Sequence, residues 1–164
     1  MISGHYQTGE PLPDDMLEKM LAAKNFQSGM QMLRQVEFAL IDMLLNANYN
    51  PSNPQAVQQV LDDVRNQVAV VIPPSFNKFQ NSFSHIFAGG YAAGYYSYKW
   101  AEVLSADAFS LFEENGVFDP ATGEKFLTTI LANGGSQEPM VLFKAFRGRE
   151  PDTEALLRHS GICS

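Results

Sequence analysis

The sequence contains one cysteine, three histidines and no HExxH motif among its 164 residues, and each shortage excludes a class of protein. Cys163 has no second cysteine to pair with, so an internal disulfide framework is excluded and a reducing compartment is favoured. His5, His85 and His159 lie far apart, and none has a second histidine four residues away on the same helix face. We therefore expect this chain to bind no zinc by itself.

Basic residues are also few, with 11 lysines and arginines against 18 acidic residues and a formal net charge of −7. A field of that sign repels phosphate, so we expect neither nucleic acid nor a membrane surface as a partner. The longest stretch without a formal charge, residues 79–98, is rich in serine and tyrosine and too polar to cross a bilayer. The chain does not begin like a signal peptide, and we expect a cytoplasmic location.

Motifs for nucleophilic catalysis and phosphate binding are missing as well. No GxSxG sequence is present, and Cys163 has no neighbouring base. The glycines at 89, 90 and 94 resemble a phosphate loop only superficially, because Tyr91 stands where the second glycine is needed. These absences leave no enzyme class identified by a local motif.

Helix boundary signals, in contrast, recur along the whole chain. Proline, aspartate, serine or asparagine precedes each segment with apolar residues at three-and-four spacing, and glycine or proline follows it. No sustained alternation indicates strands, and the apolar run 68–72 continues a helical pattern. The sequence thus predicts one all-α segment over residues 1–164 with about seven helices. Their approximate ranges are 13–24, 28–46, 54–72, 90–115, 119–133, 136–148 and 151–160.

The predicted helix 90–115 has an unusual row of phenols. At 100° per residue, Tyr91, Tyr95 and Tyr98 fall within an arc of about 60°. Buried phenol hydroxyls need hydrogen-bond partners, so an aligned set favours a wet cleft over an apolar interior. Gly89 and Gly90 each cost about 1 kcal/mol of helix propensity, which indicates a mobile entry turn or a close backbone approach. A packed amphipathic helix with tyrosines at its boundary is the alternative. The opposite stripe, predicted as core, comprises Tyr96, Trp100, Val103, Leu104 and Leu111.

The sequence FSHIFAGGYAAGYYSYKW at 83–100 resembles the thimet oligopeptidase family of zinc metallopeptidases. The resemblance extends to residues 3–9, 101–107, 134–136 and 146–151, and so to nearly the whole chain. It implies the C-terminal part of a larger, mostly helical catalytic domain. In that family the HExxH motif and a third zinc ligand, a glutamate, lie N-terminal to this segment. The implied cofactor is therefore zinc bound outside this chain, the implied substrates are short peptides, and the implied partner is the missing N-terminal part.

The resemblance also assigns roles to single residues. It implies that Tyr98 stabilises the charge that develops on the peptide carbonyl oxygen, and that His85 contacts substrate near the metal. Tyr91 and Tyr95, with Gly89 and Gly90, match the glycine-rich loop that closes on the peptide. This chain alone is then expected to be inactive, and to self-associate or to have a locally disordered loop at 89–98. The alternative is a stand-alone helical peptide-binding or scaffold domain without catalytic activity.

Overall fold

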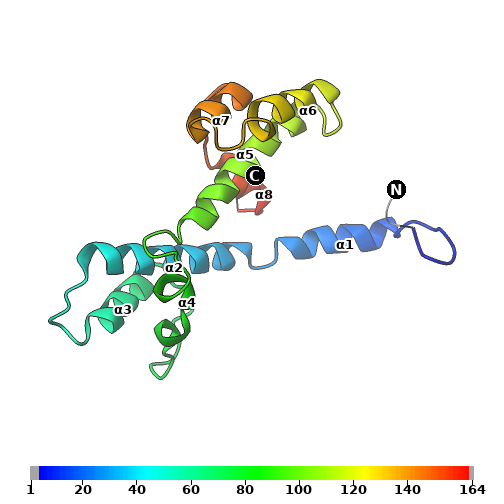
Figure 1. Cartoon of the computed structure of the whole chain (residues 1–164). Helices are drawn as coiled ribbons and strands as arrows, with labels where there is room; N and C mark the ends of the chain where they lie inside the picture. The colour runs from blue at the N-terminus through cyan, green and yellow to red at the C-terminus, as the bar shows by residue number, and fades with distance from the viewer. Residues whose placement is uncertain (1–3, 163–164) are drawn as a thin grey trace.

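The structure, a computed structural model, describes residues 4–162 and is all-helical (Figure 1), which confirms the predicted fold class. Within those residues the only β-type pairing is an isolated antiparallel bridge between Gly4 and Pro11. The α-helices are α1 (Asp14–Lys24), α2 (Ser28–Asn48), α3 (Ala56–Val68), α4 (Ser84–Phe87), α5 (Ser97–Asn115), α6 (Pro120–Phe126), α7 (Pro139–Arg147) and α8 (Glu154–His159). A 3₁₀-helix, η1 (Phe79–Ser82), precedes α4, and a π-helical turn, η2 (Leu127–Leu131), follows α6.

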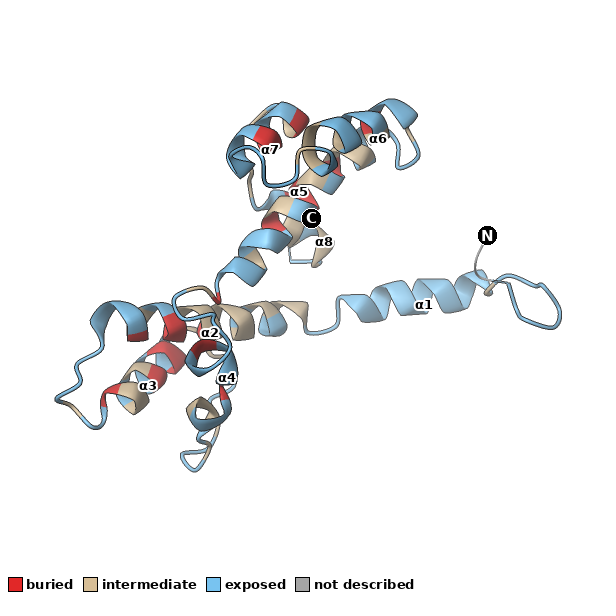
Figure 2. Ribbon diagram, in the orientation of Figure 1, coloured by how far each residue is buried: buried red, intermediate tan, exposed pale blue. Residues whose placement is uncertain are grey.

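The helices form two clusters joined by α5 (Figure 1). In the first cluster α3 lies against α2, and η1 and α4 pack beside them. In the second cluster α6, η2, α7 and α8 surround the far part of α5. α1 continues outward from the line of α2 and has no buried residue (Figure 2). The molecule is therefore open, and every residue of α1 is exposed within the described chain.

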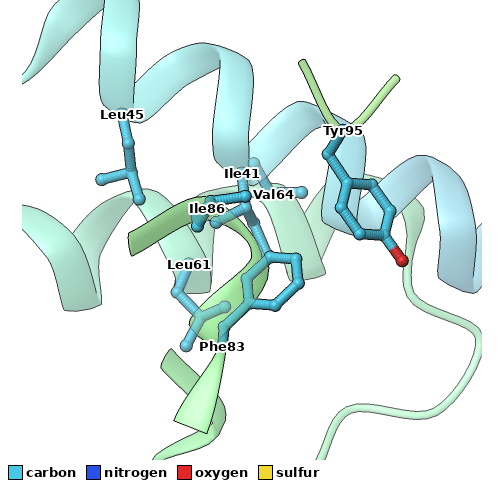
Figure 3. Packing of buried hydrophobic residues seen from close by; sticks show 7 residues of the cluster. All are labelled: Ile41, Leu45, Leu61, Val64, Phe83, Ile86 and Tyr95. Carbon is cyan, nitrogen blue, oxygen red and sulfur yellow. The ribbon is translucent and has the colours of Figure 1, made fainter. Parts of the chain in front are cut away.

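The first cluster holds a compact apolar core (Figure 3). Its buried residues are Ile41, Leu45, Leu61, Val64, Phe83, Ile86 and Tyr95. They come from α2, α3, α4 with the residue just before it, and the loop before α5, so this core ties four parts of the chain together. Phe38 and Phe79 stack at 4.7 Å between ring centroids and extend the core toward η1.

A buried ion pair links α2 to α3 beside this core. Arg65 Nε donates to Glu37 Oε1 at 3.0 Å, and Arg34 donates to the same oxygen at 2.6 Å. Arg65 also donates to Asn77 Oδ1 at 3.3 Å, and that oxygen accepts the Phe79 N–H at 3.2 Å. The pair thereby fixes where η1 begins, and η1 in turn supports the aromatic core. Removing one partner would leave a buried charge unpaired, which costs about 3–5 kcal/mol.

Several predicted helix ends are confirmed by their capping geometry. The Asp119 carboxylate accepts the Thr122 N–H at 2.7 Å, as an N-cap should. Gly116 and Gly148 follow α5 and α7 with φ of +112° and +87°, conformations that glycine adopts without strain. Local chemistry is enough to set these boundaries.

Other boundaries were predicted wrongly. The helix expected from residue 90 begins only at Ser97, because residues 92–96 form turns. α3 ends at Val68, so the run 70–72 leaves the helix and is exposed. Tyr96 and Trp100, expected in the core, are about half exposed. Within residues 4–162 no helix combines the length and apolarity needed to cross a membrane.

Candidate functional site

The candidate site begins at α4, a single helical turn that places His85. The chain then turns back sharply, because Ala88 N–H and Gly89 N–H both donate to Ser84 O at 2.7 Å. A Cβ at Gly89 would lie 3.0 Å from His85 O and 3.1 Å from His85 Cα. Position 89 therefore favours glycine because the backbone of His85 approaches closely there. A close backbone approach is one of the two explanations given above for a glycine that lowers helix propensity.

Gly90 completes the turn with φ +79°, and Tyr91 N–H then donates to His85 O at 3.1 Å. This hydrogen bond brings Tyr91 back beside the histidine that precedes it by six residues. Gly94 N–H donates to Tyr91 O at 2.8 Å and keeps the following turn tight. The glycine-rich stretch is thus a pair of turns that leads into α5, and Tyr91 and Tyr95 precede that helix.

The four aromatic residues that the sequence analysis selected do not share one face of a helix, but the structure still brings their rings together. The rings of Tyr91 and Tyr98 stack at 5.2 Å, and Tyr95 lies 5.2 Å from Tyr98. The His85 ring lies 6.2 Å from Tyr91, 5.9 Å from Tyr95 and 6.5 Å from Tyr98. We call these four residues the aromatic cluster. Its members come from α4, the turns and the first turn of α5.

The members of the aromatic cluster differ in their access to solvent. Tyr91 and Tyr98 are 37% and 41% exposed, and His85 is exposed as well. Tyr95 is only 9% exposed, and its hydroxyl donates to Gln35 Oε1 of α2 at 3.0 Å. The prediction that all three phenols face a wet cleft is therefore wrong for Tyr95, because its ring fills the core against Phe83. Direct contact between Tyr95 and a substrate stays a prediction.

The phenols of Tyr95 and Tyr98 both keep their protons at neutral pH. The neighbouring Tyr91 phenol, assisted by partial burial, raises the pKa of the Tyr98 hydroxyl above its usual value. Burial raises the pKa of Tyr95, and the positive charge of Arg34 offsets part of that effect. At neutral pH the exposed Tyr98 hydroxyl is therefore a hydrogen-bond donor, the form needed to stabilise a developing negative charge.

One residue that holds this arrangement was not identified from the sequence. Asp42 of α2 accepts backbone N–H groups from Ala93 and Tyr95, each at 2.9 Å. Its only sequence signal is a carboxylate next to Ile41, on the buried side of an amphipathic helix. Such a carboxylate must have partners, but the sequence does not say which groups provide them.

The described residues do not form a metal site of their own. Between residues 4 and 162, no three histidine, cysteine, aspartate or glutamate side chains converge closely enough to hold a metal ion. His5 bonds within its own turn to Thr8, and His159 contacts Glu113 at 2.9 Å. Cys163 lies outside the described residues.

Comparison with known proteins identifies the family of this chain. Residues 1–162 match the model of peptidase family M3. The chain belongs to peptidase family M3. Within it, the chain is 58% identical over 161 residues to oligopeptidase A of Escherichia coli, and 52% identical over 165 residues to an organellar oligopeptidase A of Arabidopsis thaliana. It is 33% identical over 165 residues to the dipeptidyl carboxypeptidase of E. coli.

These M3 relatives are much longer than this chain. The alignments cover 98%, 98% and 96% of the chain, but only 24%, 21% and 23% of the respective relatives. The chain thus spans about a quarter of the length of the curated relatives that it matches. The sequence at 83–100 predicted that the chain resembles a peptidase family, and this prediction is confirmed. The roles of single residues stay predictions.

Proposed function

We propose that this chain supplies the substrate-facing aromatic groups of a zinc-dependent M3 peptidase that hydrolyses short peptides. The supporting observation is the aromatic cluster, in which the exposed rings of His85, Tyr91 and Tyr98 meet at one surface. Two relatives whose names describe oligopeptidases match nearly the whole chain. A cytoplasmic location, predicted from the sequence, is part of this proposal.

Tyr98 has the central chemical role in this proposal. When water adds to a peptide carbonyl, the double bond opens and negative charge develops on the carbonyl oxygen. The Tyr98 O–H donates a hydrogen bond to that oxygen, and such a donor, held in position beforehand, lowers the barrier by about 3–4 kcal/mol. A phenol has an ordinary pKa of about 10 and is protonated at neutral pH, and the raised pKa of Tyr98 only widens that margin, so the hydroxyl can act as the donor.

Tyr91 and His85 bind and orient the peptide. The Tyr91 ring stacks on Tyr98 and restricts the directions in which the Tyr98 hydroxyl can point. The exposed imidazole of His85 can hydrogen-bond a peptide backbone group beside the scissile bond. Gly89 and Gly90 set the turn that brings these two side chains together, and a closing motion of that turn remains a prediction.

Zinc enters the proposal through the family resemblance. That resemblance implies that the metal would be bound by residues outside this chain, and among residues 4–162 no three possible ligands converge. In the intact enzyme it would supply Lewis-acid chemistry at the scissile carbonyl. The residues of this chain would bind the peptide, exclude water and donate the Tyr98 hydrogen bond.

A chimera tests this proposal directly. The matched quarter of E. coli oligopeptidase A is replaced by this chain, and hydrolysis of short peptides is compared with that by the parent and by this chain alone. We expect the chimera to hydrolyse the peptides and the chain alone to leave them intact. A folded, metal-loaded chimera without activity would contradict the proposal, and saturable peptide binding by the inactive chain would favour the stand-alone binding alternative.

A further inference from the structure

Asp42 is a buried carboxylate that the proposed chemistry does not use. It is 1% exposed and lies on α2 between the core residues Ile41 and Leu45. Burial of a carboxylate is unfavourable unless its oxygens are hydrogen-bonded, so its partners must provide compensation. Among the described residues no basic side chain forms a salt bridge with Asp42.

The partners of Asp42 are backbone groups of the turns before α5. Oδ1 accepts the Ala93 N–H and Oδ2 accepts the Tyr95 N–H, both at 2.9 Å. Asn46 Nδ2 donates to Oδ1 at 3.1 Å and to the Asp42 carbonyl at 2.9 Å, which fixes the side chain on its own helix. Both carboxylate oxygens therefore bind the same turn, 51 and 53 residues along the chain from Asp42.

The backbone at Ala93 needs such an anchor. Ala93 has φ +55°, a left-handed conformation that is unfavourable for a residue with a Cβ. Strained residues of this kind persist only where neighbouring contacts hold them. The turn also lies just before Ser97, where α5 begins, and a carboxylate is favoured near the N-terminus of a helix.

We propose that Asp42 is the positioning residue of the aromatic cluster: its two hydrogen bonds lock the turn between Tyr91 and Tyr98. The inference rests on the proposed function for its catalytic consequence. Without the carboxylate, Ala93 relaxes from its left-handed conformation, and the stacked phenols lose their fixed relation to each other. Asp42 touches no substrate and acts only through the two tyrosines on either side of the turn.

The anchoring is measured first on this chain by amide hydrogen exchange. In the unaltered chain we expect the Ala93 and Tyr95 amides to exchange at least about tenfold more slowly than the Ala92 amide in the same turn. In Asp42→Asn, one side-chain oxygen is replaced by an NH₂ group that cannot accept a backbone N–H. The protection of the amide that faces this group, Ala93 or Tyr95, should therefore fall by about tenfold. Asp63→Asn, at an exposed carboxylate of α3, is the control and should leave the exchange unchanged.

The catalytic consequence is measured in the chimera with E. coli oligopeptidase A. We expect Asp42→Asn to lower kcat by about 10-fold to 100-fold with a much smaller change in KM, while Asp63→Asn retains both. A folded, metal-loaded chimera that is inactive both unaltered and as Asp63→Asn refutes the proposed function without touching the anchoring result.

The inference itself is overturned in either of two ways. One is equal exchange of the Ala92, Ala93 and Tyr95 amides in the unaltered chain. The other is an unchanged kcat in an active Asp42→Asn chimera. Rapid exchange of the α3 amides would show that Asp42→Asn unfolds this chain. In that case the exchange rates of Ala92, Ala93 and Tyr95 in the unaltered chain decide whether the anchor exists.

Discussion

Gly89 shows at the residue scale how a missing side chain shapes the site. Its place in the sequence indicated either a mobile turn or a close approach, and the geometry gives the close approach to the backbone of His85. That approach folds the chain back so that Tyr91 meets the histidine. At the same scale, the motif at 83–100 predicted which residues form the cluster but not that Tyr95 is buried, because burial depends on Phe83 and on Gln35 of a distant helix.

Gly89→Ala should destabilise this chain. The added methyl group would lie 3.0 Å from His85 O, so the turn must shift, and such overpacking costs about 1–3 kcal/mol. Urea unfolding followed by circular dichroism measures the loss. Gly29→Ala in α2 is the matched control: its methyl group meets nothing within 4 Å, and we expect an unchanged or slightly higher stability. Equal stability of the two variants would refute the close approach.

At the element scale, the helices follow local signals except where a distant group intervenes. Asp119, Gly116 and Gly148 set helix ends that were predictable because each cap is made within a few residues. Residues 92–96 continue a helical pattern but form turns, since Asp42 on α2 binds two of their N–H groups. The helix ends that could be predicted are therefore those set by residues close in sequence. The turn before α5 could not be predicted, because it depends on a contact with a distant helix.

A second buried carboxylate joins elements in the other cluster. Asp107 of α5 is fully buried and accepts hydrogen bonds from Arg149 at 2.6 and 2.7 Å. It also accepts Arg147 Nε at 3.2 Å and the Asp152 N–H at 3.0 Å. One carboxylate thus connects α5 to the end of α7 and to the segment before α8. Burial alone would raise the pKa of Asp107, but these hydrogen bonds together hold it below the usual value.

The lowered pKa predicts how the stability of this chain depends on pH. A carboxyl whose pKa is lower in the folded state stabilises the fold above its unfolded pKa, near 3.9, and loses that contribution as pH falls through the folded value. At neutral pH, Asp107→Asn should lower the free energy of unfolding by about 3 kcal/mol. The difference from the unaltered chain should shrink below about pH 4. Urea titrations across this pH range measure it, and a difference that stays constant would contradict the assignment.

At the scale of the whole molecule, the fold is open and much of the chain is exposed (Figure 2), including many large apolar residues. α1 has no buried residue, although Met16, Met20 and Leu21 lie along it with more than half of their surface exposed. Exposed apolar stripes on helices of soluble proteins are commonly covered by a partner. Because the chain spans only about a quarter of its relatives, the rest of the parent enzyme is the partner that we propose for α1.

Separated from such a partner, the chain should self-associate. We expect the weight-average mass in sedimentation velocity to rise with protein concentration, since exposed apolar residues of α1 can bury one another. Met20→Lys combined with Leu21→Glu should weaken the association, whereas Lys19→Glu on the polar side of the same helix should not. A monomer at every concentration would contradict this prediction.

The most direct measurement of the central claim is kcat for peptide hydrolysis by the chimera carrying Tyr98→Phe. Tyr96→Phe, two residues earlier, exposed and outside the aromatic cluster, is the matched control. If the Tyr98 hydroxyl donates to the developing oxyanion, its removal should lower kcat by roughly 10²–10³-fold with a smaller effect on KM. The control should keep the activity of the unaltered chimera. Equal turnover by the two variants would remove Tyr98 from the chemistry and contradict the account.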